Sequence, residues 1–395
     1  MRCVLARAAE WSGMDFSWGA YEIDLRARLR SYIAEHLRPW WSHLDRDLPT
    51  EESFDAAIEF CRGLAARGLL TPAWPVEIGG AGASSWAQVV VSEELRAAGE
   101  PRGPQYTNVN WLGPAIAQLG TPAQRESLLS SISEGKAMWC QGFSEPDAGS
   151  DLAALRTTAV REGDDYVING QKVWTSYAHA ADHCFLLVRT DRESKPRQGI
   201  SILLVPMDLP GIEVREIPSL GIHHMLHEVF FQDVRVPAAC LLGAENEGWS
   251  ILRTLLANER TQVALHEEVE RGLDDLVAES IRSGVDISSD SHLETLGRAA
   301  ASAYASRLLN YVAVQASVDL SDAYPNLAAV YKASAAQMAG DASLAHLQVL
   351  GAESLLESAR GDYQMISAIE SGIGGGSLEM QLNSIAWYIL RLPKG

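Results

Sequence analysis

WCQGFSEPDAGSDLAALRT, residues 139–157, is the stretch at which this chain changes from helical to strand-like sequence. Before it, apolar residues recur every three or four positions. After it, TTAVREGDDYVINGQKVWTS at 157–176 has the short runs and turn residues of a sheet. The SEPDAGSD cluster within the stretch offers short polar side chains and backbone N–H groups, which can bind an anion or a planar heterocycle. An ordinary loop between a helix and a strand is the alternative interpretation.

Strand signals continue downstream of this stretch in four more β-branched runs: CFLLVRTD, ISILLVPMD, IEVREI and EVFFQDVRVP. Turns are predicted at Gly163–Asp164 and at Asn169–Gly170, because an Asn-Gly pair favours a tight hairpin turn. The regular spacing of the runs, between about 140 and 240, indicates a small antiparallel barrel or sandwich.

Helical periodicity flanks the β region on both sides. Helices are predicted upstream at 21–38, 52–68, 85–99 and 122–134, with a Pro- and Gly-rich loop at 71–84. Strand signals vanish after about residue 246, and Ala/Leu-rich helical stretches return, for example at 300–316 and 328–352. The predicted fold class is therefore mostly α, with a middle β domain held between helical parts.

Composition narrows the class of function. The 395 residues include 32 Lys and Arg against 51 Asp and Glu, a net charge of −19, and 47% of them are hydrophobic. Such an acidic chain is a poor partner for nucleic acid or an anionic membrane surface, and no apolar run reaches the roughly 18 residues of a membrane span. The five cysteines are widely spaced and form no CxxC pair, which favours a reduced, cytoplasmic protein. The N-terminus has no apolar signal-peptide core, and Met14 is a candidate start.

Glu259 stands out within GWSILRTLLANERTQVALHEE, residues 248–268. It falls on a helical stripe with Leu252, Leu255 and Val263, and no Lys or Arg lies three or four positions away to form a same-helix ion pair. A carboxylate facing an apolar surface holds its proton more tightly, which suits a general base. The alternatives are that the helix turns Glu259 to solvent, or that it pairs with a residue elsewhere.

Three other motifs have plainer alternatives. Trp174–Ser176 places an indole beside two hydroxyls, which can flank and hydrogen-bond a flavin-like ring, but a core tryptophan is the alternative. GIGGGS at 372–377 lacks the Lys of a phosphate loop and indicates only a turn or a close backbone approach. A metal site is suggested by three histidines, but no Cys or carboxylate completes it and we predict no metal: His223, His224 and His227.

Taken together, these motifs make the chain similar to the acyl-CoA dehydrogenase family from about residue 25 to the C-terminus. The resemblance rests on seven motifs in order: PAWPVEIGGAG (72–82), QLGTPAQRESLL (118–129), WCQGFSEPDAGSD (139–151), VINGQKVWTS (167–176), EVFFQDVRVP (228–237), NEGWSILRTLLANER (246–260) and GGGSLEMQLNSIAWYILRLP (374–393).

The resemblance implies a fold, a reaction and partners. It implies an N-terminal helical domain (1–138), a small antiparallel β-barrel (139–243) and a C-terminal four-helix bundle (244–395). It implies FAD as cofactor and an acyl-CoA thioester as substrate. A carboxylate removes the α-proton, hydride passes to flavin N5 to give the trans-2-enoyl-CoA, and electrons leave to an electron-transfer flavoprotein. A homo-oligomer, tetramer or dimer, is implied as well.

Site residues are implied by position. Three line the flavin and the thioester: Gln141, Phe143 and Ser144. Ser150 lies near the flavin pyrophosphate and the CoA arm, Trp174 covers the isoalloxazine, and Ser176 bonds near N5. Four more contact FAD, the first two on a partner subunit and the last two near the adenine half: Gln348, Gly351, Ser377 and Glu379. The implied substrate contacts are Ser150, Arg260 and Gly375.

Two departures from the family pattern matter. Many members carry the catalytic Glu near the C-terminus, in the slot that Gly375 fills here, whereas isovaleryl-CoA and long-chain dehydrogenases place it at the position of Glu259. The resemblance therefore implies Glu259 as the base, in agreement with the helix-face argument. The second departure is the usual Arg before a Phe-Gly pair, which clamps a neighbour's FAD. Only Arg282 and Arg298 lie in that region, and neither fits. Leu226–His227 also replaces the more usual Phe-Asn before Glu-Val.

Two alternatives to a homomeric dehydrogenase remain open. One is a flavin-dependent monooxygenase or oxidase on the same fold, which rapid reaction of the reduced flavin with oxygen would favour. The other is one subunit of a hetero-oligomeric acyl-CoA dehydrogenase, in which a partner supplies the missing charge. Shared fold does not decide between them.

Overall fold

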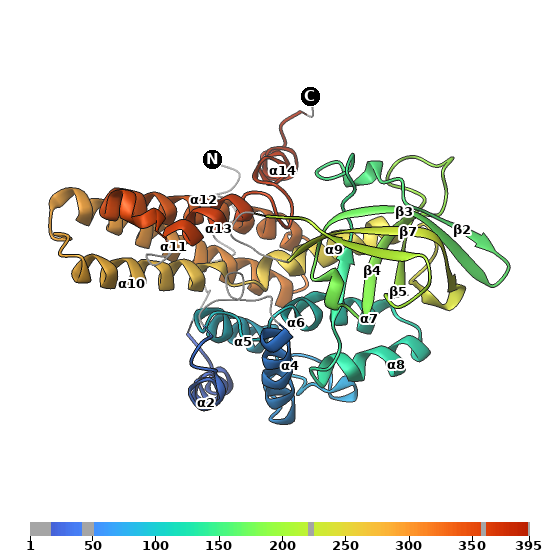
Figure 1. Ribbon diagram of the computed structural model, residues 1–395, viewed down its shortest axis with the longest axis horizontal. Helices are drawn as coiled ribbons and strands as arrows, with labels where there is room; N and C mark the ends of the chain where they lie inside the picture. Colours follow the sequence, from blue (N-terminus) through green and yellow to red (C-terminus); the bar gives the residue numbers. More distant parts are fainter. Residues whose placement is uncertain (1–16, 42–50, 220–224, 357–360, 394–395) are drawn as a thin grey trace.

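The computed structural model describes residues 17–41, 51–219, 225–356 and 361–393, and these residues form three packed parts. In Figure 1 the N-terminal helices lie below, the β sheet lies to one side and the long C-terminal helices lie to the other. The predicted fold class, helical parts on either side of a middle β domain, is confirmed. Met14, His223 and His224 lie outside the described residues.

The N-terminal part is built from helices close to the predicted ranges. The main ones are α2 (Ala20–His36), α4 (Glu51–Ala66), α5 (Ser85–Ala97), α7 (Gly113–Leu119) and α8 (Pro122–Ser133), with short turns η2 (Val76–Ile78), α6 (Gln105–Thr107) and η3 (Asn108–Leu112) between them. Helix α8 begins at a capping box, in which the Thr121 hydroxyl accepts from the Gln124 backbone N–H and the Gln124 side chain bonds the Thr121 backbone N–H.

The β domain is a single sheet in the order β6-β7-β3-β2-β4-β5-β8, with β1 paired to β4. Its strands are β1 (Trp139–Gly142), β2 (Thr158–Glu162), β3 (Asp165–Ser176), β4 (His183–Arg189), β5 (Ile200–Pro206), β6 (Ile212–Glu216), β7 (Leu226–Pro237) and β8 (Leu241–Leu242). Most pairs are antiparallel as predicted, but β1 and β2 each pair with β4 in parallel. This arrangement brings the end of β1, and the SEPDAGSD loop after it, beside the middle of the sheet.

The predicted hairpin turn at Asn169–Gly170 is wrong. The Gly163–Asp164 turn does join β2 to β3, but β3 runs on through Asn169 and Gly170 with a bulge. Tertiary contacts override the local turn preference here. The Asn169 side chain bonds both the backbone and the side chain of Asp233 on β7. Gly170 has φ 153°, and a Cβ there would lie 2.6 Å from Thr157 Cα, so only glycine fits.

The C-terminal part is a bundle of long helices. Its members are α10 (Leu265–Arg282), α11 (Asp290–Val318), α12 (Tyr324–Leu350) and α13 (Gly361–Ser371), followed by α14 (Leu378–Ser384) and η9 (Ile385–Ile389). Small residues on α12, among them Ala335, Ala339 and Ala342, are fully or almost fully buried, which lets neighbouring helices approach closely. No helix in the described part of the chain is long and apolar enough to cross a membrane.

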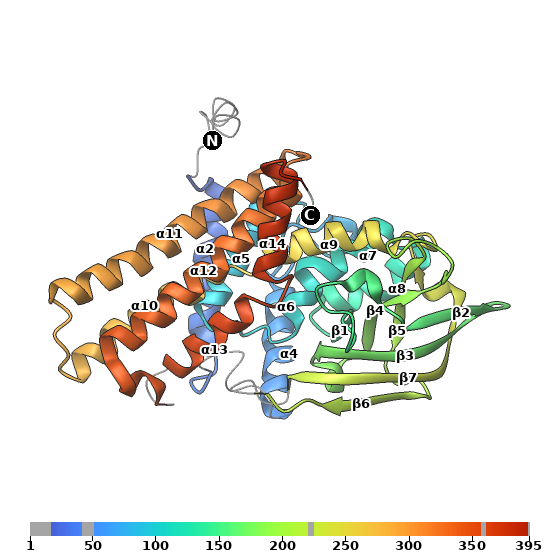
Figure 2. The ribbon, with the colours of Figure 1, turned by 90° about the horizontal axis from the view of Figure 1, so that it is seen from above.

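Helix α9 (Gly248–Thr261) joins the three parts, and Figure 2 shows it running between the sheet and the bundle. Its Leu252 and Leu255 are buried in one apolar cluster with Phe185 and Leu187 of β4 and with N-terminal residues such as Trp111. The far end of the same helix packs against α12. Any side chain near the C-terminal end of α9 therefore lies where the β domain and the bundle meet.

Candidate active site

Glu259 lies in the last turn of α9, on the side that faces the bundle. Its side chain is partly buried, and this burial raises its pKa above the ordinary value, although the positive charges of Arg260 and Lys332 oppose that shift. A glutamate that keeps its proton affinity high without a hydrogen-bonded ion partner is suited to accept a proton. The alternative in which α9 turns Glu259 fully to solvent is not what the structure has.

Gly375 lies against this carboxylate, although 116 positions separate the two residues in sequence. A Cβ on Gly375 would stand 3.4 Å from Glu259 Oε1 and 4.0 Å from Lys332 Nζ. Gly375 has φ 64°, a left-handed conformation that glycine adopts without strain. Its carbonyl oxygen accepts a hydrogen bond of 3.1 Å from Arg260 Nε. The structure thus brings three predicted site residues, Glu259, Arg260 and Gly375, into one place.

Lys332 is a member of this site that the sequence analysis missed. It lies on α12 and is 8% exposed, and burial lowers its pKa to about 8 while Glu259 and Glu370 oppose that shift. A lysine in the middle of an Ala-rich, otherwise uncharged stretch, YKASAAQMA at 331–339, was the signal that could have found it.

Trp174 marks a second group of candidate residues, on the sheet. Its indole is 57% exposed and its backbone has φ 59°, a strained conformation for a residue with a side chain, at the bulge between Lys172 and Thr175. The neighbouring Thr175 is fully buried, and its hydroxyl has no hydrogen-bond partner among the described residues. An exposed ring beside an unsatisfied hydroxyl and the partly exposed Ser176 fits a flat, hydrogen-bonding ring such as that of FAD.

The SEPDAGSD loop is fastened to the same strand. The Ser144 carbonyl accepts a hydrogen bond of 2.9 Å from the Val173 backbone N–H, one residue before Trp174. Phe143 packs edge-on against Phe185 of β4, and Gln141 lies on β1, paired with the same Phe185. The structure therefore places Gln141, Phe143 and Ser144 close to the Trp174 bulge.

A buried ion pair holds this loop in place. Lys172 Nζ donates to Glu145 Oε1 at 2.8 Å and to the Phe143 carbonyl at 3.0 Å, while the backbone N–H groups of Arg156 and Thr157 donate to the same carboxylate. Burial raises the pKa of Glu145, but the Lys172 charge and these hydrogen bonds lower it overall. Neither residue was singled out from the sequence. Side chains alternate between the two faces of β3, and a lysine in a strand normally points to solvent, so the sequence did not indicate that Lys172 is buried.

The remaining predicted cofactor residues lie apart from these two groups. Ser150 is exposed in the loop after β1. Ser377 caps α14 by accepting from the Met380 backbone N–H, and Glu379 follows in the first turn, exposed. Gln348 is exposed on α12, where it accepts a hydrogen bond from Thr295, and Gly351 ends that helix. Gln348 lies sixteen positions after Lys332 on the same helix, about 24 Å away, so Gln348 cannot reach its own subunit's Glu259.

The segment around Arg282 and Arg298, where the family resemblance places an arginine that clamps a neighbour's FAD, has no buried cation among the described residues. Arg282 is exposed and bonded to Glu279 at the end of α10, and Arg298 is exposed and bonded to Glu294 on α11. Each is engaged within its own helix, so neither reaches out from the bundle as a preformed FAD contact.

A cluster with metal-ligand chemistry does occur between the N-terminal part and the bundle, at Glu93, His266 and Glu267. Its carboxylate oxygens are already bonded: Glu93 accepts from Arg26 at 2.7 Å and from the Tyr311 hydroxyl at 2.7 Å, and Glu267 pairs with Arg307. This donor set is an ion-pair network that joins the two helical parts rather than a site for a cation. His227, from the predicted histidine trio, is buried on β7 and bonds the Met225 carbonyl.

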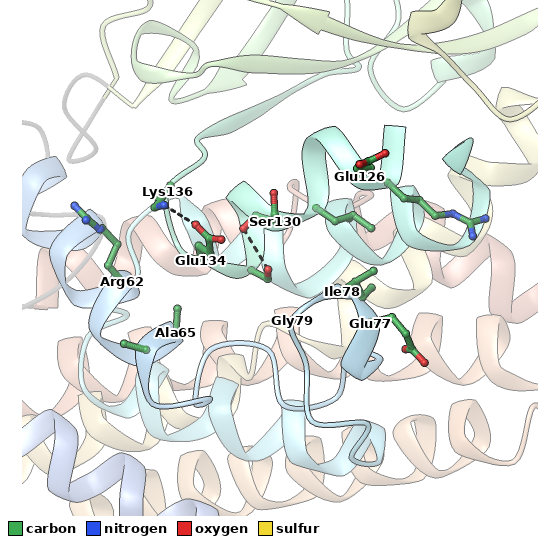
Figure 3. Close-up of a pocket in the computed structure, with 13 residues that line it drawn as sticks. Arg62, Ala65, Glu77, Ile78, Gly79, Glu126, Ser130, Glu134 and Lys136 are labelled. Carbon is green, nitrogen blue, oxygen red and sulfur yellow. Dashed lines mark hydrogen bonds and ion pairs between the residues drawn. The ribbon is translucent and has the colours of Figure 1, made fainter. Parts of the chain in front are cut away.

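A surface groove lies away from all of these residues, between α4, η2 and α8 (Figure 3). Its volume is about 790 Å³, and its lining includes Arg62, Glu77, Arg125, Glu134 and Lys136. The charges are balanced, and Lys136 is paired with Glu134. None of the predicted site residues lines it.

Comparison with known proteins identifies the family of the chain. The chain matches the profiles of the acyl-CoA dehydrogenase N-terminal domain at residues 21–136, middle domain at 140–234 and C-terminal domain at 246–390. The acyl-CoA dehydrogenase FadE26 of Mycobacterium tuberculosis is 31% identical over 96% of this chain and 99% of its own length. Another curated relative, 38% identical, aligns over 62% of this chain, and the chain spans less than two thirds (65%) of that relative's length.

Two solved structures are similar over almost the whole chain. The structure titled "Tcur3481-Tcur3483 steroid ACAD" superimposes with a TM-score of 0.83 at 29% identity, covering 97% of this chain and 100% of that one. The ChsE4-ChsE5 complex of Mycobacterium tuberculosis has a TM-score of 0.83 at 30% identity, with the same coverage.

Proposed function

This chain belongs to the acyl-CoA dehydrogenase family of oxidoreductases, and from that premise we propose that it catalyses the FAD-dependent α,β-dehydrogenation of an acyl-CoA thioester, with Glu259 as the base. The observation that carries the proposal is the partly buried carboxylate of Glu259 beside Gly375, at the junction of the β domain and the bundle. The family's other base position is a glycine here, so a carboxylate on α9 has the space to act.

Glu259 accepts the proton from the carbon next to the thioester carbonyl. The α-proton is acidified by that carbonyl, but it still needs a base whose proton affinity is higher than that of an ordinary glutamate. Burial supplies this, because it raises the pKa of Glu259. Arg260 holds the Gly375 carbonyl through Nε, which fixes the backbone on the other side of the space that the acyl group would enter.

FAD, when bound, would accept the hydride from the β-carbon. The residues that would hold it are those of the sheet: Gln141, Phe143, Ser144, Trp174 and Ser176, with Ser150 toward the pyrophosphate. The exposed Trp174 indole supports this assignment, and so does the Thr175 hydroxyl, which has no hydrogen-bond partner among the residues that the structure describes. Ser377 and Glu379 are proposed to lie near the adenine half.

We infer further that the substrate is the CoA ester of a bulky, steroid-like acid and that the working enzyme contains a second, different subunit. The support is that one similar structure is titled a steroid ACAD, and the other is a complex of two differently named proteins. Arg282 and Arg298, both bonded within their own helices, leave the FAD clamp to a partner. Gln348 and Gly351 would contact the partner's cofactor, and electrons would leave to an electron-transfer flavoprotein.

The test combines cofactor content with a substrate panel. The chain is purified alone and together with neighbouring gene products, bound FAD is counted per chain, and acyl-CoAs from short branched to steroid side chains are offered with an artificial electron acceptor. The proposal expects FAD-bound protein that oxidises at least one acyl-CoA. Protein that binds FAD but oxidises no thioester, and whose reduced flavin reacts rapidly with oxygen, would favour a monooxygenase or oxidase instead.

A further inference from the structure

Lys332 is a largely buried cation that makes no hydrogen bond or ion pair with the residues that the structure describes. Its side chain is 8% exposed, and no carboxylate or hydrogen-bond acceptor of the described chain lies within bonding distance of its Nζ. Removing even part of an ammonium group from water costs free energy, so a lysine with so little exposed surface calls for a specific reason. Its neighbours on α12 are mostly Ala, so the surrounding helix does not itself require a charged residue at this position.

The geometry suggests that Lys332 is placed there to act on the Glu259 carboxylate. The two side chains lie on opposite sides of a small space over Gly375, which we call the notch. Lys332 Nζ and Glu259 Oε1 come from different helices, α12 and α9, yet each lies within 4.0 Å of the point where a Cβ on Gly375 would stand. Lys332 Cε lies 3.7 Å from that point, so the lysine stem forms one wall of the notch and the carboxylate forms another. The two charges face the same small volume without closing into a direct ion pair.

We propose that Lys332 is a positioning residue for the reaction: its ammonium group is a second counter-charge, beside Arg260, that keeps the partly buried Glu259 carboxylate ionised and turned toward the notch. The proposal rests on the proposed function, in which Glu259 is the base. A direct ion pair would tie the carboxylate down and lower its proton affinity strongly, whereas a charge held at this separation favours the ionised form and leaves the oxygen free to take a proton.

Other charged groups also lie around the pair. Arg260, next to Glu259 on α9, bonds the neutral Gly375 carbonyl and so keeps its positive charge, which favours the ionised form of Glu259 more strongly than Lys332 does. Glu370 of α13 acts on Lys332 from the exposed side, and Tyr324 at the start of α12 bonds Asn258. Arg307 of α11 is bound by α10 carboxylates, and η3 and β5, which also pack on α9, carry no charged side chain. Removing Lys332 therefore removes the cation that α12 places across the notch from the carboxylate, and leaves the charge of Arg260 on α9 in place.

The experiment compares Lys332→Met, Lys332→Arg and the control Lys136→Met, a surface lysine in the groove of Figure 3. Each FAD-bound protein is titrated by difference infrared spectroscopy, in which the protonated Glu259 carboxyl band is identified by its loss in Glu259→Gln. In Lys332→Met the band should appear at a pH higher by about one unit or more, as expected for losing an opposite charge at ~4–6 Å. Lys332→Arg and Lys136→Met should titrate like the wild-type protein.

Kinetics give the second readout. The acid limb of kcat/KM should move up with the infrared titration in Lys332→Met, while KM at high pH stays near wild type. An unchanged Glu259 titration in well-folded, FAD-loaded Lys332→Met would overturn the proposal. So would an unchanged titration with a KM raised tenfold or more, which would make Lys332 a substrate contact. The infrared titration needs no turnover, so it tests Lys332 even where Glu259→Gln proves active and the proposed base is wrong.

Discussion

The Glu259 carboxylate and the Gly375 backbone occupy two sides of one small space: Oε1 lies 3.4 Å from where a side chain on residue 375 would begin. A carboxylate could enter this space from α9 or from the loop before α14. Because residue 375 of that loop is a glycine, the carboxylate in this protein comes from Glu259 of α9. A carboxylate oxygen placed in this space from either side could therefore act as the base.

Glu259→Gln should abolish most of the reaction without disturbing the fold. Glutamine keeps the size and hydrogen bonding but has no basic oxygen, so flavin reduction by a good acyl-CoA should slow by roughly 10²–10⁴-fold, the usual contribution of a general base. Anaerobic stopped-flow bleaching of the flavin band measures this. FAD content and melting temperature should match the wild-type protein, and reduction at the wild-type rate would rule out Glu259 as the base.

Trp174→Ala should weaken FAD binding while leaving the apoprotein about as stable as before. The indole is 57% exposed, so it contributes little to the core, and its φ of 59° means that the native fold already bears strain at this position. Titration of apoprotein with FAD, followed by fluorescence, measures the affinity. Trp40→Ala is the matched control, since Trp40 is also a partly exposed tryptophan, 42%, on the N-terminal helical part. Equal FAD affinity in both variants would contradict the assignment.

The sequence predicted the architecture well because periodicity is a local property. The start of α8 at Pro122 and the β2–β3 turn at Gly163–Asp164 depend on residues within a few positions of each other. The burial of Glu259 was predicted for the same reason, since the stripe Leu252, Leu255, Val263 identifies the buried face of α9.

What the sequence did not predict depends on contacts between distant segments. Asn169–Gly170 has the local signature of a turn, but the bonds between Asn169 and Asp233 keep it in a strand. Lys332 belongs to the site only because α12 packs on α9, and Lys172 is buried only because the SEPDAGSD loop folds back with Glu145. The Ala-rich setting of Lys332 marks that residue as unusual, but a single sequence does not indicate which helix packs beside it.

Lys172→Met should destabilise the protein by about 3–5 kcal/mol, because it leaves the buried Glu145 carboxylate without its cation. The double variant Glu145→Gln/Lys172→Met should recover much of that loss, since no uncompensated charge remains. Urea unfolding of the three proteins gives the comparison. A single variant as stable as the wild-type protein would show that the backbone N–H groups of Arg156 and Thr157 satisfy the carboxylate alone.

Acid should loosen the contact between the N-terminal helices and the bundle through Glu93. Burial by itself would raise the pKa of Glu93, but hydrogen bonds from His266, Arg26 and Tyr311 lower it to about 2. A carboxyl whose pKa is lower in the folded protein contributes stability above its ordinary pKa of 4.5, and this is lost as the pH falls toward 2.

Glu93→Gln should therefore cost roughly 3 kcal/mol at pH 7 and progressively less below pH 4.5. Unfolding free energies at several pH values measure the difference. The control is Glu162→Gln, which removes a surface partner of Arg235 and should leave both stability and its pH dependence near wild type. A Glu93→Gln penalty that is the same at pH 3 and pH 7 would contradict the assigned titration.

Moving the carboxylate to the other side of its space should restore part of the activity. In Glu259→Ala the base is gone; in Glu259→Ala/Gly375→Glu a new side chain begins 3.4 Å from the position that the lost oxygen held and faces Lys332 as before. The left-handed backbone at 375, φ 64°, penalises a residue with a Cβ by about 1 kcal/mol, so the double variant should be slightly less stable than Glu259→Ala. Flavin reduction should nevertheless be faster than in the single variant, by at least about tenfold if the new base recovers even part of the ~10²–10⁴-fold general-base contribution.

Glu259→Ala/Gly374→Glu is the matched control, because a Cβ on Gly374 would lie only near the Glu370 carbonyl, away from the notch. Equal rates in the two double variants would mean that the space beside Gly375 is not where the proton is taken.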